Sequence, residues 1–121
     1  DLAREALADL VRSSARSLRL ADIDQAVCAA FGISESDLKS TRRSRAVNQP
    51  RMLAMFLARK HTGAALADIG RHFGRRSHST VVAAEKTVRK WMTSQSSIVL
   101  ADATWDVEQA IRRVEDVLRA G

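Results

Sequence analysis

Residues 66–90 read LADIGRHFGRRSHSTVVAAEKTVRK, and this stretch decides the fold. Its first part carries apolar residues at helical spacing, at Leu66, Ile69 and Phe73. Gly74 follows, where a left-handed turn can form. A second helix is predicted from Ser77, with its inner side formed by Val81, Ala84, Val88 and Trp91. Two helices joined by a short turn are typical of a helix-turn-helix, whose second helix enters the major groove of DNA.

The first turn of this second helix carries only short polar side chains and one histidine: Ser77, His78, Ser79 and Thr80. Two arginines precede it in the turn, Arg75 and Arg76. Side chains of this kind can bond base edges and phosphates. The sequence therefore predicts base reading by the first turn and DNA backbone contacts by the two arginines.

The distribution of charge supports a surface that binds a polyanion. The chain has 121 residues, a length that fits one domain. Its formal net charge is +6. Residues 39–90 contain thirteen Lys or Arg and two acidic residues. The rest of the chain contains seven Lys or Arg and twelve acidic residues. Segregation of this kind is typical of proteins that bind nucleic acid. The single cysteine, Cys28, lies in an apolar run and is expected to be an inert core residue in a reducing cytosol.

A basic loop and a long helix are predicted before this stretch. The loop holds three arginines, Arg42, Arg43 and Arg45, for which we favour phosphate or minor-groove contacts over a plain solvated surface. Asn48 is expected to cap the helix, with Pro50 in its first turn. Its apolar positions predict a central core helix that ends at Gly63. Two of its cations, Arg51 and Arg59, can reach phosphate or simply face water.

The remaining elements complete an all-α prediction. Residues 20–31 form a core-facing helix ended by Gly32, and Ser34 caps a short helix that follows. Residues 93–97 are expected to be a loop, and a last helix carries Val107, Ile111, Val114 and Leu118. Residues 1–16 predict an amphipathic helix, either docked on this domain or connecting it to a domain upstream. We therefore divide the chain into a connector helix and linker (1–19) and a compact helix-turn-helix domain (20–121).

Several motifs in fixed order resemble the C-terminal DNA-binding domain of the bacterial replication initiator family, DnaA. They are RRSR (42–45), PR (50–51), LAR (57–59), DIG (68–70), FG (73–74) and HSTV (78–81). The resemblance implies that Arg43 enters the minor groove of an origin box, with Arg42 and Arg45 beside it. It also implies that His78, Ser79 and Thr80 read the major groove or hold the backbone, and that Arg51 and Arg59 contact phosphates.

The chain departs from the family pattern at four positions. Arg75 stands where the family has glycine, and Ser77 stands where it has a base-contacting aspartate. Ser79 replaces a threonine, and Met52 replaces a residue that is often polar. A serine hydroxyl can donate or accept but has a shorter reach than a carboxylate, so the base preferred at Ser77 is expected to differ.

The resemblance further implies an ATPase module outside this chain, because no G-x-x-x-x-G-K-[ST] occurs here. We therefore expect no cofactor or metal in this chain, with ATP confined to the missing domain, and a monomer that assembles through other domains. Binding to double-stranded origin DNA during initiation of replication, in the cytoplasm at the nucleoid and away from membranes, is the expected function. The alternative is a transcription regulator of the Trp-repressor type, which would need a dimer surface. An enzyme is not expected, because neither paired carboxylates nor a nucleophile with a matched base accompanies the histidines.

Overall fold

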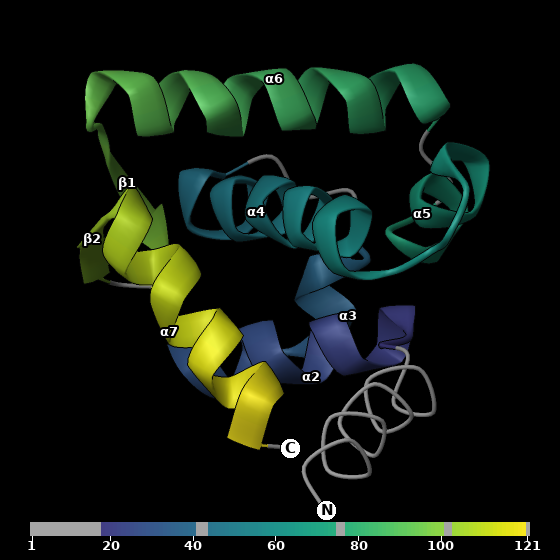
Figure 1. The fold of residues 1–121 in the computed structure, drawn as a ribbon, viewed down its shortest axis with the longest axis horizontal. Helices are drawn as coiled ribbons and strands as arrows, with labels where there is room; N and C mark the ends of the chain where they lie inside the picture. The colour runs from purple at the N-terminus through teal and green to yellow at the C-terminus, as the bar shows by residue number, and fades with distance from the viewer. Residues whose placement is uncertain (1–17, 41–43, 75–76, 101–102, 121) are drawn as a thin grey trace, which may run out of the picture.

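The computed structural model describes residues 18–40, 44–74, 77–100 and 103–120. Over these ranges the chain forms six helices and one two-stranded sheet. One long helix, α6 (His78–Ser94), lies across the top of the domain above α4 (Arg45–His61), as Figure 1 shows. The predicted helical domain is confirmed, and the small sheet is an addition to it. The expected helix over residues 1–16 lies outside the described residues.

The first described helices begin and end where their capping residues predict. Helix α2 (Leu20–Phe31) ends at Gly32, whose φ of 68° is the left-handed conformation that glycine adopts most easily. Helix α3 (Glu35–Leu38) is capped by Ser34, whose side-chain oxygen accepts a hydrogen bond from the Asp37 backbone N–H at 3.1 Å. Both predicted ends are confirmed.

Helix α4 begins earlier than the sequence suggested. Its first residue is Arg45 and Ser44 is its N-cap, so Asn48 does not cap it and Pro50 lies inside the helix. Proline has no N–H, so it cannot donate to the carbonyl of Ala46 as a helical residue would. The expectation of Pro50 in the first turn was therefore wrong, because the helix continues by one turn before it.

The two helices of the predicted helix-turn-helix are present. Helix α5 (Leu66–His72) leads to Gly74, whose φ is 104°, and α6 begins just after the N-cap Ser77. Helix α6 continues through Ser94 and ends at Gln95, whose φ is 53°. The predicted loop over residues 93–97 is therefore shorter than expected, with only two residues between α6 and the first strand.

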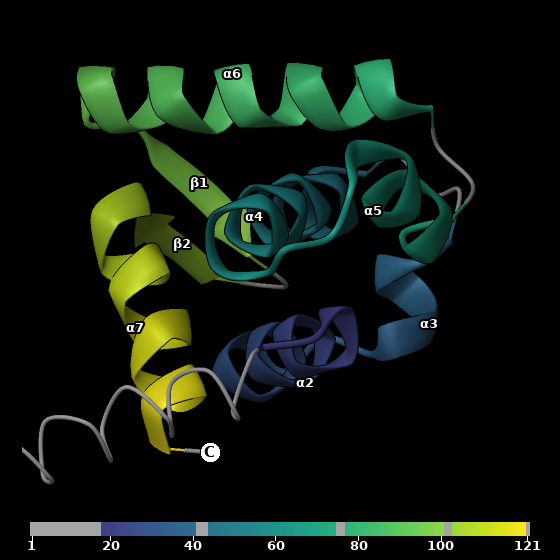
Figure 2. The same cartoon turned by 45° about the vertical axis from the view of Figure 1, so that its right-hand side comes forward.

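A β-hairpin and a final helix close the domain. Strand β1 (Ser97–Leu100) pairs antiparallel with β2 (Ala103–Asp106), and α7 (Val107–Ala120) follows directly. The hairpin lies between the end of α6 and α7 in Figure 2. Trp105 anchors it, because its ring meets the ring of Phe31 edge-on at 5.2 Å and lies 5.9 Å from the Arg113 guanidinium carbon.

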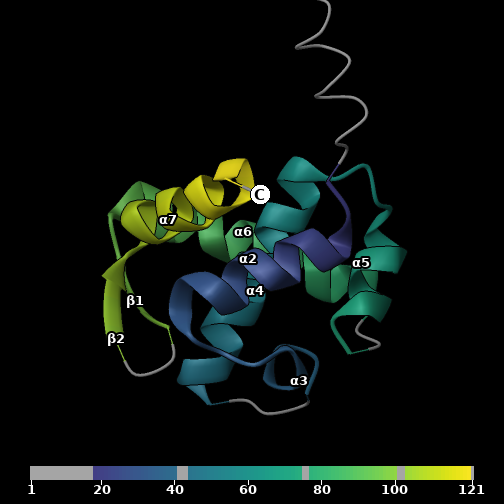
Figure 3. The ribbon, with the colours of Figure 1, turned by 90° about the horizontal axis from the view of Figure 1, so that it is seen from below.

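One hydrophobic core joins all the long helices. Helix α4 packs against both α2 and α6, and α7 packs against α2, beside which it lies in the view from below (Figure 3). Fully buried residues come from every layer, among them Ile23, Val27, Leu53, Leu57, Ile69, Phe73, Val81, Val88 and Val114. Cys28 packs partly buried against this core, and burial raises the pKa of its thiol to about 11. The thiol therefore stays protonated near neutral pH, in agreement with the predicted inert cysteine.

Candidate nucleic-acid interface

The first turn of α6 presents its side chains to solvent. Ser77, His78, Ser79 and Thr80 are all exposed, whereas Val81, Ala84 and Val88 are buried on the opposite side of the helix. The apolar residues recur every three or four positions, which fixes this side against the domain. The polar first turn therefore makes no contribution to the core and is free to contact a ligand.

The geometry of this turn suits an anion and a base edge. The Ser77 hydroxyl lies 2.7 Å from the Ser79 hydroxyl and 3.2 Å from the Thr80 hydroxyl. Helix α6 has no acidic residue in its first turn, and its first backbone N–H groups lack partners within the helix. The positive end of the helix dipole favours a phosphate at this position.

A shallow hollow continues the exposed turn along the helix. It is lined by His78, Ser79, Val82, Ala83 and Lys86. Its lining combines polar side chains with the apolar Val82 and Ala83, a mixture suited to the major-groove edge of DNA, where hydrogen-bonding atoms alternate with thymine methyl groups. Sequence reasoning missed Val82 and Ala83 as part of the site, although they lie four residues after His78 and Ser79 and so on the same side of the helix, and Lys86 follows Val82 by four residues.

Cations surround this surface, and one carboxylate lies among them. Lys86, Arg89 and Lys90 are exposed on α6. Glu85 is only 17% exposed and forms ion pairs with Arg59 at 3.6 Å and with Arg89 at 3.4 Å. The predicted backbone-contacting Arg59 is thus half-exposed and already bound to a carboxylate of α6.

The other predicted DNA-contacting arginines have different outcomes. Arg45 is exposed as the first residue of α4. Four of them lie outside the described residues: Arg42, Arg43, Arg75 and Arg76. Of the eleven predicted site residues, the structure brings four together in one exposed turn and leaves the roles of these four arginines as predictions.

The burial of Arg51 is at odds with its predicted phosphate contact. Its side chain is 1% exposed. The Nε atom donates to the Leu38 carbonyl at 2.9 Å, and Nη2 donates to the Asp37 carbonyl at 3.1 Å. A guanidinium enclosed in this way cannot reach a phosphate on the surface without leaving its acceptors, so it belongs to the support of the site.

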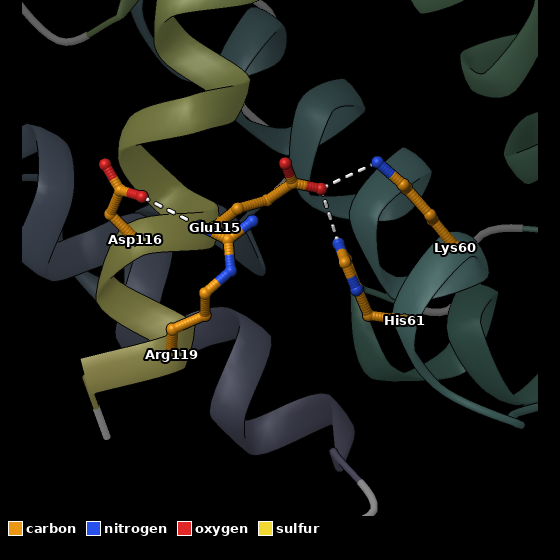
Figure 4. A network of polar contacts seen from close by, with 5 residues as sticks. All are labelled: Lys60, His61, Glu115, Asp116 and Arg119. Atoms are coloured by element: carbon orange, nitrogen blue, oxygen red, sulfur yellow. Dashed lines mark hydrogen bonds and ion pairs between the residues drawn. The ribbon is translucent and has the colours of Figure 1, made fainter. Parts of the chain in front are cut away.

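Two histidines outside the exposed turn hold helices together. His72 of α5 lies 2.6 Å from Asp24 of α2, and His61 of α4 lies 2.7 Å from Glu115 of α7. Figure 4 shows one oxygen of Glu115 in contact with both His61 and Lys60, and the Lys60 Nζ donates to it at 2.7 Å. Both histidines are partly buried.

The described residues contain no group of three or more His, Cys, Asp or Glu side chains placed to hold a metal ion. Of the described helices, none is both long and apolar enough to cross a membrane.

Known proteins are similar to this chain in sequence. The family described as the bacterial DnaA protein helix-turn-helix matches residues 20–88. The chromosomal replication initiator protein DnaA of Sphingopyxis alaskensis is 42% identical over 113 residues, which are 93% of this chain and 23% of that protein. The protein of the same name from Wolbachia pipientis wMel is 43% identical over 94 residues, 78% of this chain and 20% of that protein. The chain thus spans about a fifth of the length of these curated relatives. It belongs to the bacterial DnaA helix-turn-helix family.

Proposed function

We propose that residues 20–121 bind double-stranded DNA at replication-origin boxes, as the DNA-binding part of a chromosomal replication initiator. The observation that carries this proposal is the exposed first turn of α6, where His78 and three hydroxyl side chains stand free of the core. The cations on the outer side of α6 support it, because they supply the phosphate attraction that such a reader needs. The names of the relatives give the biological process.

We assign the roles of the residues as the resemblance implies. Ser77, His78, Ser79 and Thr80 read base edges in the major groove, and Arg43 enters the adjacent minor groove. Arg42, Arg45, Arg59, Arg75 and Arg76 neutralise phosphates and supply most of the affinity. Val82 and Ala83 in the lining of the hollow give an apolar surface for a thymine methyl group.

The proposal extends to the organisation of the protein. This part of the chain has no catalytic activity of its own, and ATP binds to a module that precedes it. Residues 1–19 connect the two. The isolated domain is monomeric, and assembly at the origin occurs through the other domains, at the nucleoid in the cytoplasm. A dimeric regulator of the Trp-repressor type is not favoured, since the relatives are replication initiators.

Fluorescence anisotropy with an origin-type box and a scrambled duplex tests the proposal. At about 50 and about 200 mM salt, we expect affinity for both duplexes to fall with salt, and the box to be preferred at each. Equal affinity for both duplexes at both salt concentrations would refute sequence-specific binding.

Two variants test the assigned readers. His78→Ala and Arg43→Ala are each expected to weaken box binding by about 1–3 kcal/mol and to reduce discrimination. His78 is exposed, so its replacement should change the free energy of unfolding by less than about 0.5 kcal/mol. Gln109→Ala on α7, also exposed, is the matched control and should change neither binding nor stability. Equal losses on the box and the scrambled duplex would contradict a base-reading role.

A further inference from the structure

We infer that Lys86 is a base-reading residue that selects a guanine in the major groove, two helical turns after His78. The inference rests on the proposed DNA binding and deepens it. It separates one lysine of α6 from the cations that attract phosphates, and it names a base that the same surface recognises.

Lys86 lies in the hollow that continues the exposed turn along α6. His78, Val82 and Lys86 follow one another at intervals of four residues, so they form one row along the helix. Ser79 and Ala83 form the neighbouring row. Side chains of an α-helix lean toward its N-terminus, so the side chain of Lys86 extends from its own turn toward Val82 and Ala83. The ammonium group therefore faces the same ligand as the first turn.

The other cations of α6 have different surroundings. Arg89 lies 3.4 Å from the carboxylate of Glu85, and Lys90 is exposed one turn beyond the hollow. Within the part of the chain that the structure describes, Lys86 forms no ion pair. Among the described residues that line the hollow, it is the only lysine or arginine. Its three N–H donors are therefore available to a ligand.

The dimensions of the helix and of DNA place Lys86 inside the groove. Lys86 follows His78 by eight residues, which at about 1.5 Å per residue is about 12 Å along the helix axis. The major groove of B-DNA is about 12 Å wide. Val82 and Ala83 have short side chains, so they let the helix come close to the base edges. Because its side chain leans back toward the first turn, Lys86 reaches base edges before it reaches phosphates beyond them.

An ammonium group at this position distinguishes guanine from the other bases. Guanine presents two acceptors in the major groove, O6 and N7. Adenine has an amino donor beside its N7, cytosine presents an amino donor, and thymine has its methyl group beside O4. The donors of Lys86 can thus satisfy two acceptors of guanine, whereas the amino groups of adenine and cytosine would face them with further donors. A preference for guanine follows.

The base preference is measured by fluorescence anisotropy with the 121-residue chain and a set of origin-type boxes. Each guanine of the box is replaced in turn by 7-deazaguanine, which lacks the N7 acceptor, and each G·C pair is replaced by A·T. We expect Lys86→Met to bind the unmodified box about tenfold more weakly and to lose less than about threefold on the scrambled duplex. At one guanine, both replacements should weaken binding by the wild type and have no further effect on Lys86→Met.

Two more variants sharpen the test. Lys86→Gln replaces the ammonium group by an amide, which can pair with N6 and N7 of adenine, so this variant should favour adenine at that same position. Lys90→Met is the matched control, because it removes the same charge one turn further along α6. It should change binding to the box and to the scrambled duplex equally and leave every base preference as it is. Both lysines are exposed, so all three variants should remain folded, which circular dichroism checks.

Equal losses of Lys86→Met on the box and on the scrambled duplex would overturn the inference, because they would show a phosphate contact. Guanine preferences that are the same in the wild type and in the Lys86 variants would overturn it as well. Failure of the proposed function is distinct, because the wild-type chain would then show no preference for the box over the scrambled duplex.

Discussion

A histidine meets a carboxylate at two places in this domain, and the two sites differ in their access to water. Asp24 is fully buried, and its Oδ1 atom has no hydrogen-bond partner. Burial raises the pKa of this carboxyl, although His72 and Lys39 act in the opposite direction. Burial also acts to raise the pKa of Glu115, but hydrogen bonds from Lys60 and His61 outweigh it, and the pKa is lowered. The number of donors and the access of water decide the direction, not the presence of a histidine.

The two contacts also support different parts of the DNA-binding surface. Asp24 joins α2 to α5, the first helix of the helix-turn-helix, whereas Glu115 joins α7 to the end of α4. The first contact is buried and leaves one oxygen unsatisfied, so it is sensitive to the loss of its partner. The second is closer to solvent, and its loss exposes groups that water can satisfy.

The largest expected effect is that of His72→Ala on stability. This change leaves the buried Asp24 without its nearest donor and should lower the free energy of unfolding by about 3 kcal/mol. Asp24→Asn keeps the shape and removes the charge, so His72→Ala should cost much less in an Asp24→Asn background. Urea unfolding of both single variants and the double variant measures the coupling. If the losses of free energy of unfolding in the two single variants simply add in the double variant, the charge of Asp24 is not the reason why His72 is needed.

A smaller effect is expected at the second site. Glu115→Gln weakens the bonds to Lys60 and His61 and should lower the free energy of unfolding by about 0.5–1 kcal/mol, because Lys60 is half-exposed. Asp116→Asn is the matched control on the same helix (Figure 4). Its carboxylate is 70% exposed and 3.0 Å from Arg119, so we expect no more than a few tenths of a kcal/mol, or about a third of the Glu115 effect. Equal losses of free energy of unfolding in the two variants would show that Glu115 contributes no more to stability than the exposed Asp116.

The smallest effects, seen in the pH dependence of stability, should have opposite signs. The folded-state pKa of Glu115 is lowered from 4.5, so its stabilisation is present above that pH and is lost as pH falls through the folded pKa. The folded-state pKa of Asp24 is raised from 3.8, so the folded state binds more protons above that pH, and stability falls as pH rises through this range. The groups that act on Asp24 are His72, Lys39 and Glu35.

Unfolding between about pH 7 and about pH 3 tests both signs. The stability deficit of Glu115→Gln relative to wild type should shrink as the pH falls. The stability of Asp24→Asn relative to wild type should instead improve as the pH rises. Parallel pH profiles for the two variants would show that the carboxylates do not differ as described.

Much of the helical fold could be predicted because local rules and the core agree. Gly32 ends α2 because it has no side chain to oppose a left-handed conformation, and Ser34 starts α3 through the hydrogen bond that its hydroxyl accepts. The buried residues of α6 follow its apolar period. The hairpin was missed because its strands have four residues each, too few for an alternating pattern to stand out. Its position depends on Trp105 meeting Phe31, a contact between distant parts of the chain.

The exposed turn of the candidate site could be predicted from the sequence, but the buried residues that hold the site in place could not. The turn at Ser77 to Thr80 is polar and is followed by the apolar residues of the inner side of α6, a pattern that can be read from the sequence alone. The burial of Arg51 was missed because arginine is rarely enclosed, and its acceptors are carbonyls about a dozen residues earlier in the chain. The early start of α4 was missed because proline is usually found in the first turn of a helix, whereas Pro50 lies inside α4.

The ion pairs of Glu85 affect how many salt ions DNA displaces. A phosphate that approaches Arg59 or Arg89 competes with a carboxylate that each arginine already contacts. Part of the positive charge is thus neutralised internally before DNA arrives, and binding there exchanges one anion for another. The number of counterions released from the duplex will consequently be smaller than the number of cationic side chains on this surface.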